Sequence, residues 1–168
     1  MTAGEGLAVL ILCTGNSARS ILGEAIVGRM GEGRLSAYSA GSQPKGAPHP
    51  GALRLLARKG YDTGGVRSKS WDEFAAPDAP RIDIAITVCG NAAGEACPLF
   101  SGAPVRAHWG LADPADAVGE AAEDAAFAET WRLLELRVGA MLALPLEIMT
   151  PAERRAALND IGRMEGAA

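Results

Sequence analysis

The chain has 168 residues, of which 48% are hydrophobic and 21% are charged, and its formal net charge at pH 7 is −4. This length predicts one domain with a hydrophobic core of its own, and the acidic balance argues against a general nucleic-acid binder, which normally presents a basic face. No apolar run approaches the ~20 residues of a membrane-spanning helix and the first residues lack the basic start of a secretory signal, so we expect a cytoplasmic protein with no membrane partner.

Apolar runs and helical patterns alternate along the chain. Residues 7–12 form a short apolar run typical of a buried strand, and residues 20–30 place apolar side chains at helical spacing before glycines end the pattern. Further strands are predicted at residues 34–40, 82–88 and 103–107, further helices at 50–59, 121–143 and 151–163, and a helical turn at 71–74. This order predicts a single α/β domain, residues 1–168, with an open parallel four-stranded sheet and helices on both faces.

The C-terminal part, from about residue 144 to 168, is expected to be a helical extension of that domain. Its last helix opens on a capping box formed by Thr150 and Glu153, with Pro151 at the first helical position. Packing on the domain and dimerisation are both open roles for this helix.

Two of the three cysteines directly follow predicted strands. Cys13 comes after the first strand and Cys89 after the third. Because ligands of open parallel sheets bind at the carboxyl ends of the strands, both thiols are predicted at the same edge. Structural disulfides are rare in the cytosol, so these cysteines favour catalytic, redox or metal-binding roles.

The loop after Cys13 has the composition of an anion-binding site. Backbone N–H groups at a helix N-terminus can surround a tetrahedral oxyanion, Gly15 permits unusual backbone angles, and Arg19 can bind two anion oxygens at once. The same positive field favours the thiolate of Cys13, a nucleophile facing the bound oxyanion. A buried structural cysteine beside an ordinary turn is the alternative. The residues expected to bind the oxyanion are Thr14, Gly15, Asn16, Ser17, Ala18, Arg19 and Ser20.

Residues 13–20, Cys-Thr-Gly-Asn-Ser-Ala-Arg-Ser, resemble the phosphate loop of the low-molecular-weight protein tyrosine phosphatase superfamily, and within it most closely the arsenate reductases. The resemblance covers about residues 7–143 and includes residues 39–41, 87–89, 97–98 and 108–110. It implies a flavodoxin-like fold of the phosphotyrosine phosphatase I type. The loop alone does not separate a phosphatase from a reductase.

The other two cysteines favour the reductase, because a phosphatase of this fold needs a single cysteine. The resemblance implies that Cys13 attacks arsenic(V), that Cys89 then attacks the Cys13 sulfur so that arsenite leaves with two electrons, and that Cys97 resolves the disulfide into a Cys89–Cys97 bond. Thioredoxin, or glutathione with glutaredoxin, is the implied electron donor, and no bound cofactor is expected.

Other roles for these two cysteines stay open. Cys89 could be a small core residue and Cys97 a loop residue, whereas zinc binding is disfavoured by the spacing of the pair and by the presence of only two histidines. The link between them is longer by one residue than is usual in thioredoxin-coupled members. Cys97 could therefore be idle, with a small thiol and a glutaredoxin-type partner in its place.

Asp113, which precedes a proline after the fourth predicted strand, is the general acid that the resemblance implies. Asp116 is a nearby rival, and an ordinary Asp-Pro turn is the alternative. Many phosphatases of this fold have an aromatic residue after the Asp-Pro pair, where Ala115 stands here, so a small inorganic substrate is favoured. Residues 108–109, His-Trp, are expected to pack the loop around Asp113.

Some thioredoxin-coupled members hold a potassium ion near the loop through Asn, Glu, Ser and Asp side chains. Asn16, Glu24 and Ser39 match three of these positions, and Lys69 stands at the fourth. Because a lysine ammonium could replace the cation, we expect no metal. The alternative is that Lys69 is a solvated surface residue.

We therefore predict an arsenate reductase that serves arsenic detoxification. The first alternative is a low-molecular-weight protein tyrosine phosphatase that hydrolyses phosphotyrosine or aryl phosphates through a Cys13 phosphoenzyme. A non-catalytic arsenite or oxyanion sensor is the second; Arg19 and Asp113 argue against it, since thiols bind arsenite without either. The predicted catalytic residues are Cys13, Arg19, Asp113, Cys89 and Cys97.

Overall fold

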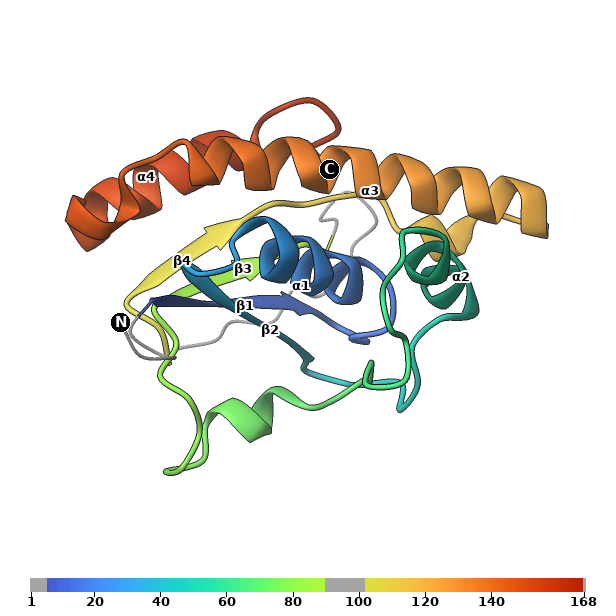
Figure 1. The fold of residues 1–168 in the computed structure, drawn as a ribbon, viewed down its shortest axis with the longest axis horizontal. Coiled ribbons are helices and arrows are strands. Elements are labelled where there is room, and N and C mark those ends of the chain that lie inside the picture. The colour runs from blue at the N-terminus through green and yellow to red at the C-terminus, as the bar shows by residue number, and fades with distance from the viewer. Residues whose placement is uncertain (1–5, 90–101, 168) are drawn as a thin grey trace.

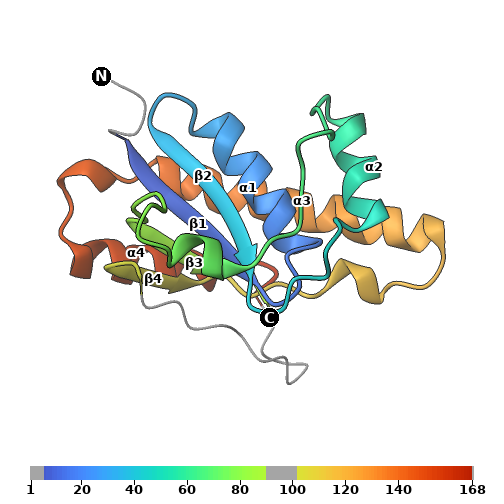
Figure 2. The same ribbon diagram turned by 90° about the horizontal axis from the view of Figure 1, so that it is seen from below.

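The computed structural model describes residues 6–89 and 102–167, which contain an open sheet of four parallel strands (Figure 1, Figure 2). The strands are β1 (Leu7–Cys13), β2 (Leu35–Gly41), β3 (Ile84–Thr87) and β4 (Val105–His108), in the spatial order β2–β1–β3–β4. Leu12 of β1 lies opposite Thr87 of β3. The predicted parallel sheet is confirmed, and the carboxyl ends of β1 and β3 meet at one edge.

The helices alternate with the strands as predicted. They are α1 (Arg19–Met30), α2 (Pro50–Arg58), α3 (Glu120–Leu142) and α4 (Pro151–Gly162), with short 3-10 helices η1 (Trp71–Phe74), η2 (Pro114–Asp116) and η3 (Leu146–Ile148). β3 is shorter at both ends than the predicted strand; at its start, the side chain of Asp83 accepts the backbone N–H of Ala8 at 2.9 Å in place of a ladder carbonyl. Within the described residues, no helix is long and apolar enough to cross a bilayer.

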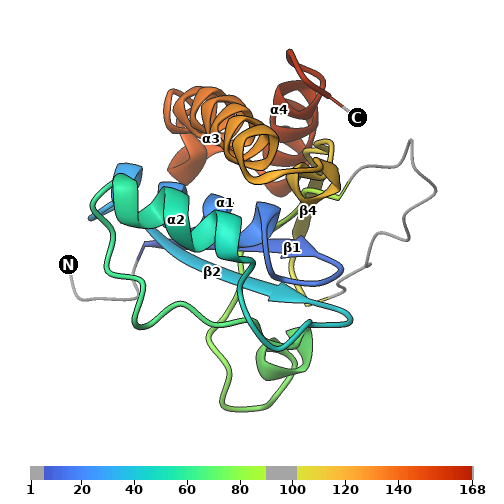
Figure 3. The ribbon, with the colours of Figure 1, turned by 90° about the vertical axis from the view of Figure 1, so that its right-hand side faces the viewer.

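The alternating side chains of β1 explain how the two faces of the sheet are covered. Val9 and Ile11 pack with the α-helices, whereas Leu10 and Leu12 point to the opposite face and join the cluster that η1 flanks. Figure 3 shows α1–α4 above the sheet and the turn of η1 below it. Helices therefore lie on both faces, as predicted, although the α-helices among the described residues gather on one of them.

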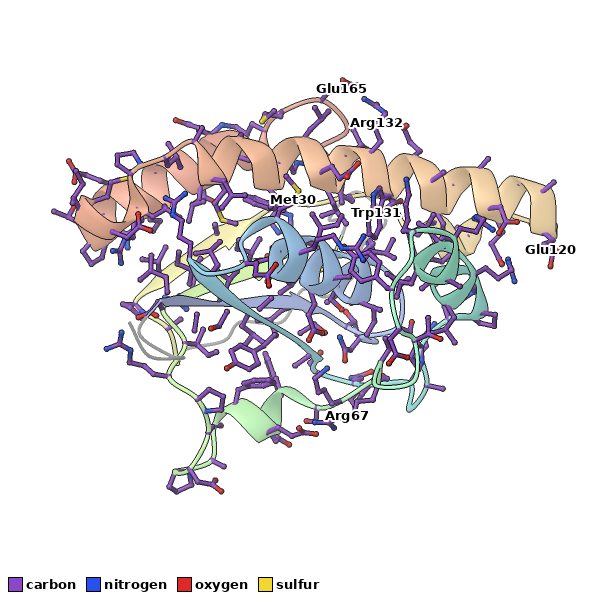
Figure 4. The ribbon with its side chains drawn as sticks, in the orientation of Figure 1. Met30, Arg67, Glu120, Trp131, Arg132 and Glu165 are labelled. Atoms are coloured by element: carbon purple, nitrogen blue, oxygen red, sulfur yellow. The ribbon has the colours of Figure 1, made fainter. Side chains whose placement is uncertain are left out.

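The longest helix, α3, buries the apolar stripe that its sequence predicts. Phe127, Trp131, Leu134, Val138 and Met141 recur at helical spacing, and each is at most 4% exposed. In Figure 4 the Trp131 side chain points from α3 toward the layer that contains α1. One face of α3 thus closes the main core, which explains how a helix with an acidic first turn is held against the sheet.

Residues 108–109 pack against α4, a neighbour that the sequence-based expectation did not include. Trp109 is fully buried and its Nε1 donates to the backbone oxygen of Leu158 in α4 at 2.8 Å. Burial and the neighbouring Arg137 lower the pKa of His108, so its imidazole is neutral at pH 7. The reason for the difference is that β4 is the outer strand of the sheet, and α4 covers this edge.

We predict that Gly51→Ala destabilises the fold by about 1–3 kcal/mol. A Cβ at Gly51 would lie 2.7 Å from Cε2 of the buried Phe127 ring, which has no free end to move aside. Gly139→Ala is the matched control, because its Cβ would meet only the Met30 methyl at 4.0 Å and alanine favours a helix interior. Urea unfolding of the two variants measures the difference; equal stabilities would show that the α2–α3 contact is loose.

Candidate active site

The loop at residues 14–18, between β1 and α1, turns several backbone carbonyls outward. The backbone N–H groups of Gln43, Lys45 and His49 donate to the carbonyl oxygens of Thr14, Gly15 and Ser17, at 2.9, 3.0 and 2.8 Å. The Ser68 hydroxyl also donates to the Gly15 oxygen, at 3.0 Å. In a trans peptide the next N–H points opposite to the carbonyl. Outward carbonyls therefore direct the following N–H groups into the loop, which is the arrangement that binds an anion.

The buried side chain of Asn16 holds this loop in shape. Its backbone has a left-handed φ of 44°, a region that asparagine tolerates better than most residues. The amide nitrogen donates to the hydroxyls of Ser20 at 2.8 Å and Ser39 at 3.0 Å, and the amide oxygen accepts the Lys69 N–H at 2.8 Å. One side chain thus ties the loop to α1, to β2 and to the segment before η1.

Lys69 lies against the acidic end of this network. Its side chain is only 9% exposed, and its ammonium is 3.7 Å from Glu24 Oε1 and 3.4 Å from Ser39 Oγ. The Ser39 hydroxyl in turn donates to Glu24 at 2.5 Å. The ammonium therefore stands next to two of the residues that were considered as cation ligands. Within residues 6–89 and 102–167, no group of three His, Cys, Asp or Glu side chains is placed to hold a metal ion.

Cys13 ends β1 with a free thiol that is 4% exposed, and its Sγ lies 2.9 Å from the Ser20 hydroxyl. Because Ser20 Oγ already accepts a hydrogen bond from Asn16, its own proton is available to the sulfur. The geometry therefore suits a nucleophile at the base of an anion loop.

Arg19 begins α1 and joins the loop to the segment after β4. The guanidinium is 4% exposed; Nη1 donates to the Leu111 carbonyl at 2.8 Å, and Nη2 is 3.6 Å from Asp113 Oδ2. The contact with Leu111 fixes the plane of the guanidinium. An arginine held in this way presents its remaining donors in a fixed direction.

Asp113 is the candidate acid that the fold brings to the loop. Its Oδ1 accepts the Ala115 N–H at 3.0 Å as the cap of η2, which leaves Oδ2 on the side of Arg19. The side chain is 31% exposed and so remains open to solvent. Asp116, the rival, is exposed on η2, and the Arg19 ion pair distinguishes Asp113 from it.

Cys89 lies two residues beyond the Leu12–Thr87 pair, and Cys13 lies one residue beyond it, so both stand at the same edge of the sheet. Cys89 is fully buried and disulfide-bonded. Cys97, the third cysteine of the predicted set, lies outside the described residues.

The contacts from Gln43, Lys45, His49 and Ser68 were not predicted from the sequence. Three of them are backbone contacts across a proline-rich loop, and any non-proline residue can supply a backbone N–H. Of these four contacts, only the one from Lys45 corresponds to a visible sequence feature, the glycine at position 15. The Lys45 side chain crosses Gly15, where a Cβ would lie 3.2 Å from the lysine carbons.

The site defines a class of enzyme in which a thiolate attacks a tetrahedral oxyanion. It combines a buried cysteine, an anion loop, an arginine and an aspartate at the edge of a parallel sheet where the strands end. The comparison with known families agrees. A profile of the low molecular weight phosphotyrosine protein phosphatases matches residues 8–150, and this chain belongs to that family.

Relatives within this fold confirm the resemblance to arsenate reductases. An arsenate reductase from Bacillus licheniformis is 35% identical over 120 residues, which are 71% of this chain and 82% of the relative. The crystal structure of an arsenate reductase from Archaeoglobus fulgidus has a TM-score of 0.59 and 25% identity, covering 78% of this chain and 98% of that one. A thioredoxin-dependent arsenate reductase from Corynebacterium glutamicum has a TM-score of 0.51 and 25% identity, covering 80% of this chain and 65% of that one.

We predict that Ser39→Ala lowers stability by about 1–3 kcal/mol and weakens phosphate binding, because it leaves a buried Asn16 N–H without its acceptor. Ser36→Ala on the same strand is the control, since the Ser36 side chain takes no part in the bonds described above. Urea unfolding and calorimetric titration with phosphate measure both effects. The role assigned to Asn16 would be wrong if the two variants bound phosphate equally well.

Proposed function

We propose that this protein is an arsenate reductase that converts arsenate to arsenite with electrons from its own thiols. The observation that carries the proposal is the pairing of an anion loop around Cys13 with a second cysteine, Cys89, at the same edge of the sheet. A thiolate and an anion loop suffice for phosphate ester hydrolysis, whereas reduction of arsenic needs a second thiol that forms a disulfide with the first as arsenite leaves. The arsenate reductases among the relatives support the same choice.

The first step is attack of the Cys13 thiolate on arsenic(V). The loop N–H groups and Arg19 hold the oxyanion in front of Sγ, and the new S–As bond forms as one oxygen leaves as water. Asp113 supplies the proton for this oxygen, because its carboxyl stands on the Arg19 side of the loop and is open to solvent.

The second step transfers the electrons. The Cys89 thiolate attacks Sγ of Cys13, the S–As bond breaks, and arsenic leaves as arsenite with the electron pair of that bond. The two sulfurs are oxidised to a disulfide while arsenic goes from +5 to +3. Cys97 then attacks Cys89, which frees Cys13 and leaves a Cys89–Cys97 disulfide.

An external thiol reductant must reopen that disulfide before the next turnover. The thioredoxin-dependent relative supports thioredoxin as the donor, and glutathione with glutaredoxin is the other donor that the chemistry accepts. Both operate in a reducing compartment. We therefore propose a cytoplasmic enzyme whose partners are an oxyanion and a small redox protein, with no bound cofactor and no role in nucleic-acid or membrane binding.

Reduced wild-type protein without external reductant should release one arsenite per chain on adding arsenate and lose two thiols, because each reduction consumes one pair of sulfurs. Cys13→Ser should release none. Arsenite release is measured by chromatography with arsenic detection, and thiols by titration in denaturant. Hydrolysis of an aryl phosphate that requires Cys13, with no arsenite under any reductant, would instead make the protein a phosphatase.

Asp113→Asn should lower kcat for arsenite release by about 10²–10⁴-fold, the usual effect of losing a general acid. Asp116→Asn should leave kcat within about twofold, since this side chain is exposed on η2 and the Arg19 ion pair belongs to Asp113. Steady-state kinetics at saturating arsenate with a thioredoxin system compare the two. A larger loss in the Asp116 variant would assign the acid to that residue.

A further inference from the structure

Helix α4 lies outside the segment that defines the family. The family match ends at residue 150, and α4 covers Pro151–Gly162. Figure 2 shows α4 beside β4 at the outer edge of the sheet. Because a bare outer strand would expose unpaired backbone groups, a covering helix has a structural use there. The contacts it makes, however, are concentrated on the residues that lead to the active site.

Three contacts connect α4 to the end of β4. The Asn159 side-chain oxygen accepts the His108 N–H at 3.0 Å, and the Leu158 carbonyl accepts the indole N–H of Trp109 at 2.8 Å. Gly162 packs so closely that a Cβ there would overlap the His108 carbonyl oxygen. The helix thus holds both the backbone and the side chain of residues 108–109.

Residues 108–109 are followed in the chain by the segment that carries Asp113, the proposed general acid. Leu111 lies two residues after Trp109. Its N–H donates to the Val88 carbonyl at 3.1 Å, and its own carbonyl accepts a hydrogen bond from the Arg19 guanidinium at 2.8 Å. Asp113 follows two residues later and pairs with the same arginine. A shift of residues 108–109 would therefore move the Leu111 carbonyl and the Asp113 carboxyl together.

The segment after α4 folds back over α3 and holds the helix in place. Glu165 forms an ion pair with Arg132 of α3 at 2.7 Å, and its backbone oxygen accepts a bond from the fully buried Arg137. Figure 4 shows Glu165 and Arg132 close together above α3. At the other end, Thr150 and Glu153 form the complete capping box that starts α4. The capping box satisfies the start of the helix itself, and Arg154 in its first turn donates to the Leu146 carbonyl at 2.7 Å, so contacts outside α4 hold it near both ends.

We infer that α4 is a positioning element for the reaction, and that Asn159 and Trp109 are positioning residues that set the place of Asp113 relative to Arg19. This inference rests on the proposed function for its activity readout. The oxyanion loop itself is held from other segments, by the N–H groups of Gln43, Lys45 and His49. Loosening α4 moves both Asp113 and the Leu111 carbonyl that orients Arg19, but it leaves these loop N–H groups in place, so proton delivery should suffer more than oxyanion binding.

Two variants of Asn159 separate positioning from simple stabilisation. Asn159→Leu removes the acceptor for the His108 N–H while keeping the side-chain size, and because leucine has the higher helix propensity, a weaker helix would not explain a loss. Asn159→Asp keeps an acceptor oxygen at the same place; it replaces the amide donor to Arg155, which makes an exposed bond, and adds one negative charge. Asn159 lies on α4, outside the oxyanion loop, and both variants are made in the full chain.

Three readouts are compared with wild type on the reduced protein. Asn159→Leu should slow single-turnover arsenite release by about tenfold or more, as expected for a small misplacement of a reacting group, and phosphate affinity should change less than about threefold. Amide hydrogen exchange in peptides covering residues 109–117 should rise in the same variant. Asn159→Asp should restore the rate and the exchange to near wild-type values.

The inference is overturned if Asn159→Leu raises exchange at residues 109–117 without slowing arsenite release, because α4 would then only cover the strand edge. It is also overturned if neither readout changes, or if Asn159→Asp is as impaired as Asn159→Leu. A wild-type protein that releases no arsenite would contradict the proposed function instead. In that case the exchange measurement still decides whether α4 holds the loop.

Discussion

The buried amide of Asn16 is the contact on which the active site depends. It bonds to Ser20, Ser39 and the Lys69 backbone at once, so one side chain sets the shape of the loop and holds the Ser20 hydroxyl that lies 2.9 Å from the Cys13 sulfur. A buried network of this kind is stable only when every member is bonded. The loop, the thiol and the Lys69–Glu24 pair therefore form a single unit rather than separate features.

A second constraint is the parallel sheet, which collects residues that are far apart in the chain. β1 delivers Cys13, β3 delivers Cys89 and the segment after β4 delivers Asp113, all at one carboxyl edge. Arg19 connects the first and the last of these through Leu111 and Asp113. Chemistry at this edge is thus coupled to the position of β4, and through β4 to the helix that covers it.

Much of this arrangement could be predicted from local sequence. The apolar run before Cys13, the helical stripe of α3 and the capping box at Thr150 each carry their signal within a few residues, and each appears in the structure. The outward carbonyls of the loop could not be predicted, because their partners are backbone groups at residues 43–49. The packing of Trp109 against α4 was also missed, since burial of a tryptophan does not reveal which neighbour accepts its indole N–H.

The central claim is that the thiols of this chain supply the two electrons that reduce arsenic. The resulting disulfide first joins Cys13 to Cys89 and is then exchanged for one between Cys89 and Cys97. The most direct test is peptide mapping by mass spectrometry after one turnover with arsenate, in the absence of reductant. The account predicts a Cys89–Cys97 disulfide in the wild type and a trapped Cys13–Cys89 disulfide in Cys97→Ser. Arsenite release with all three thiols intact, or a disulfide that never includes Cys89, would contradict it.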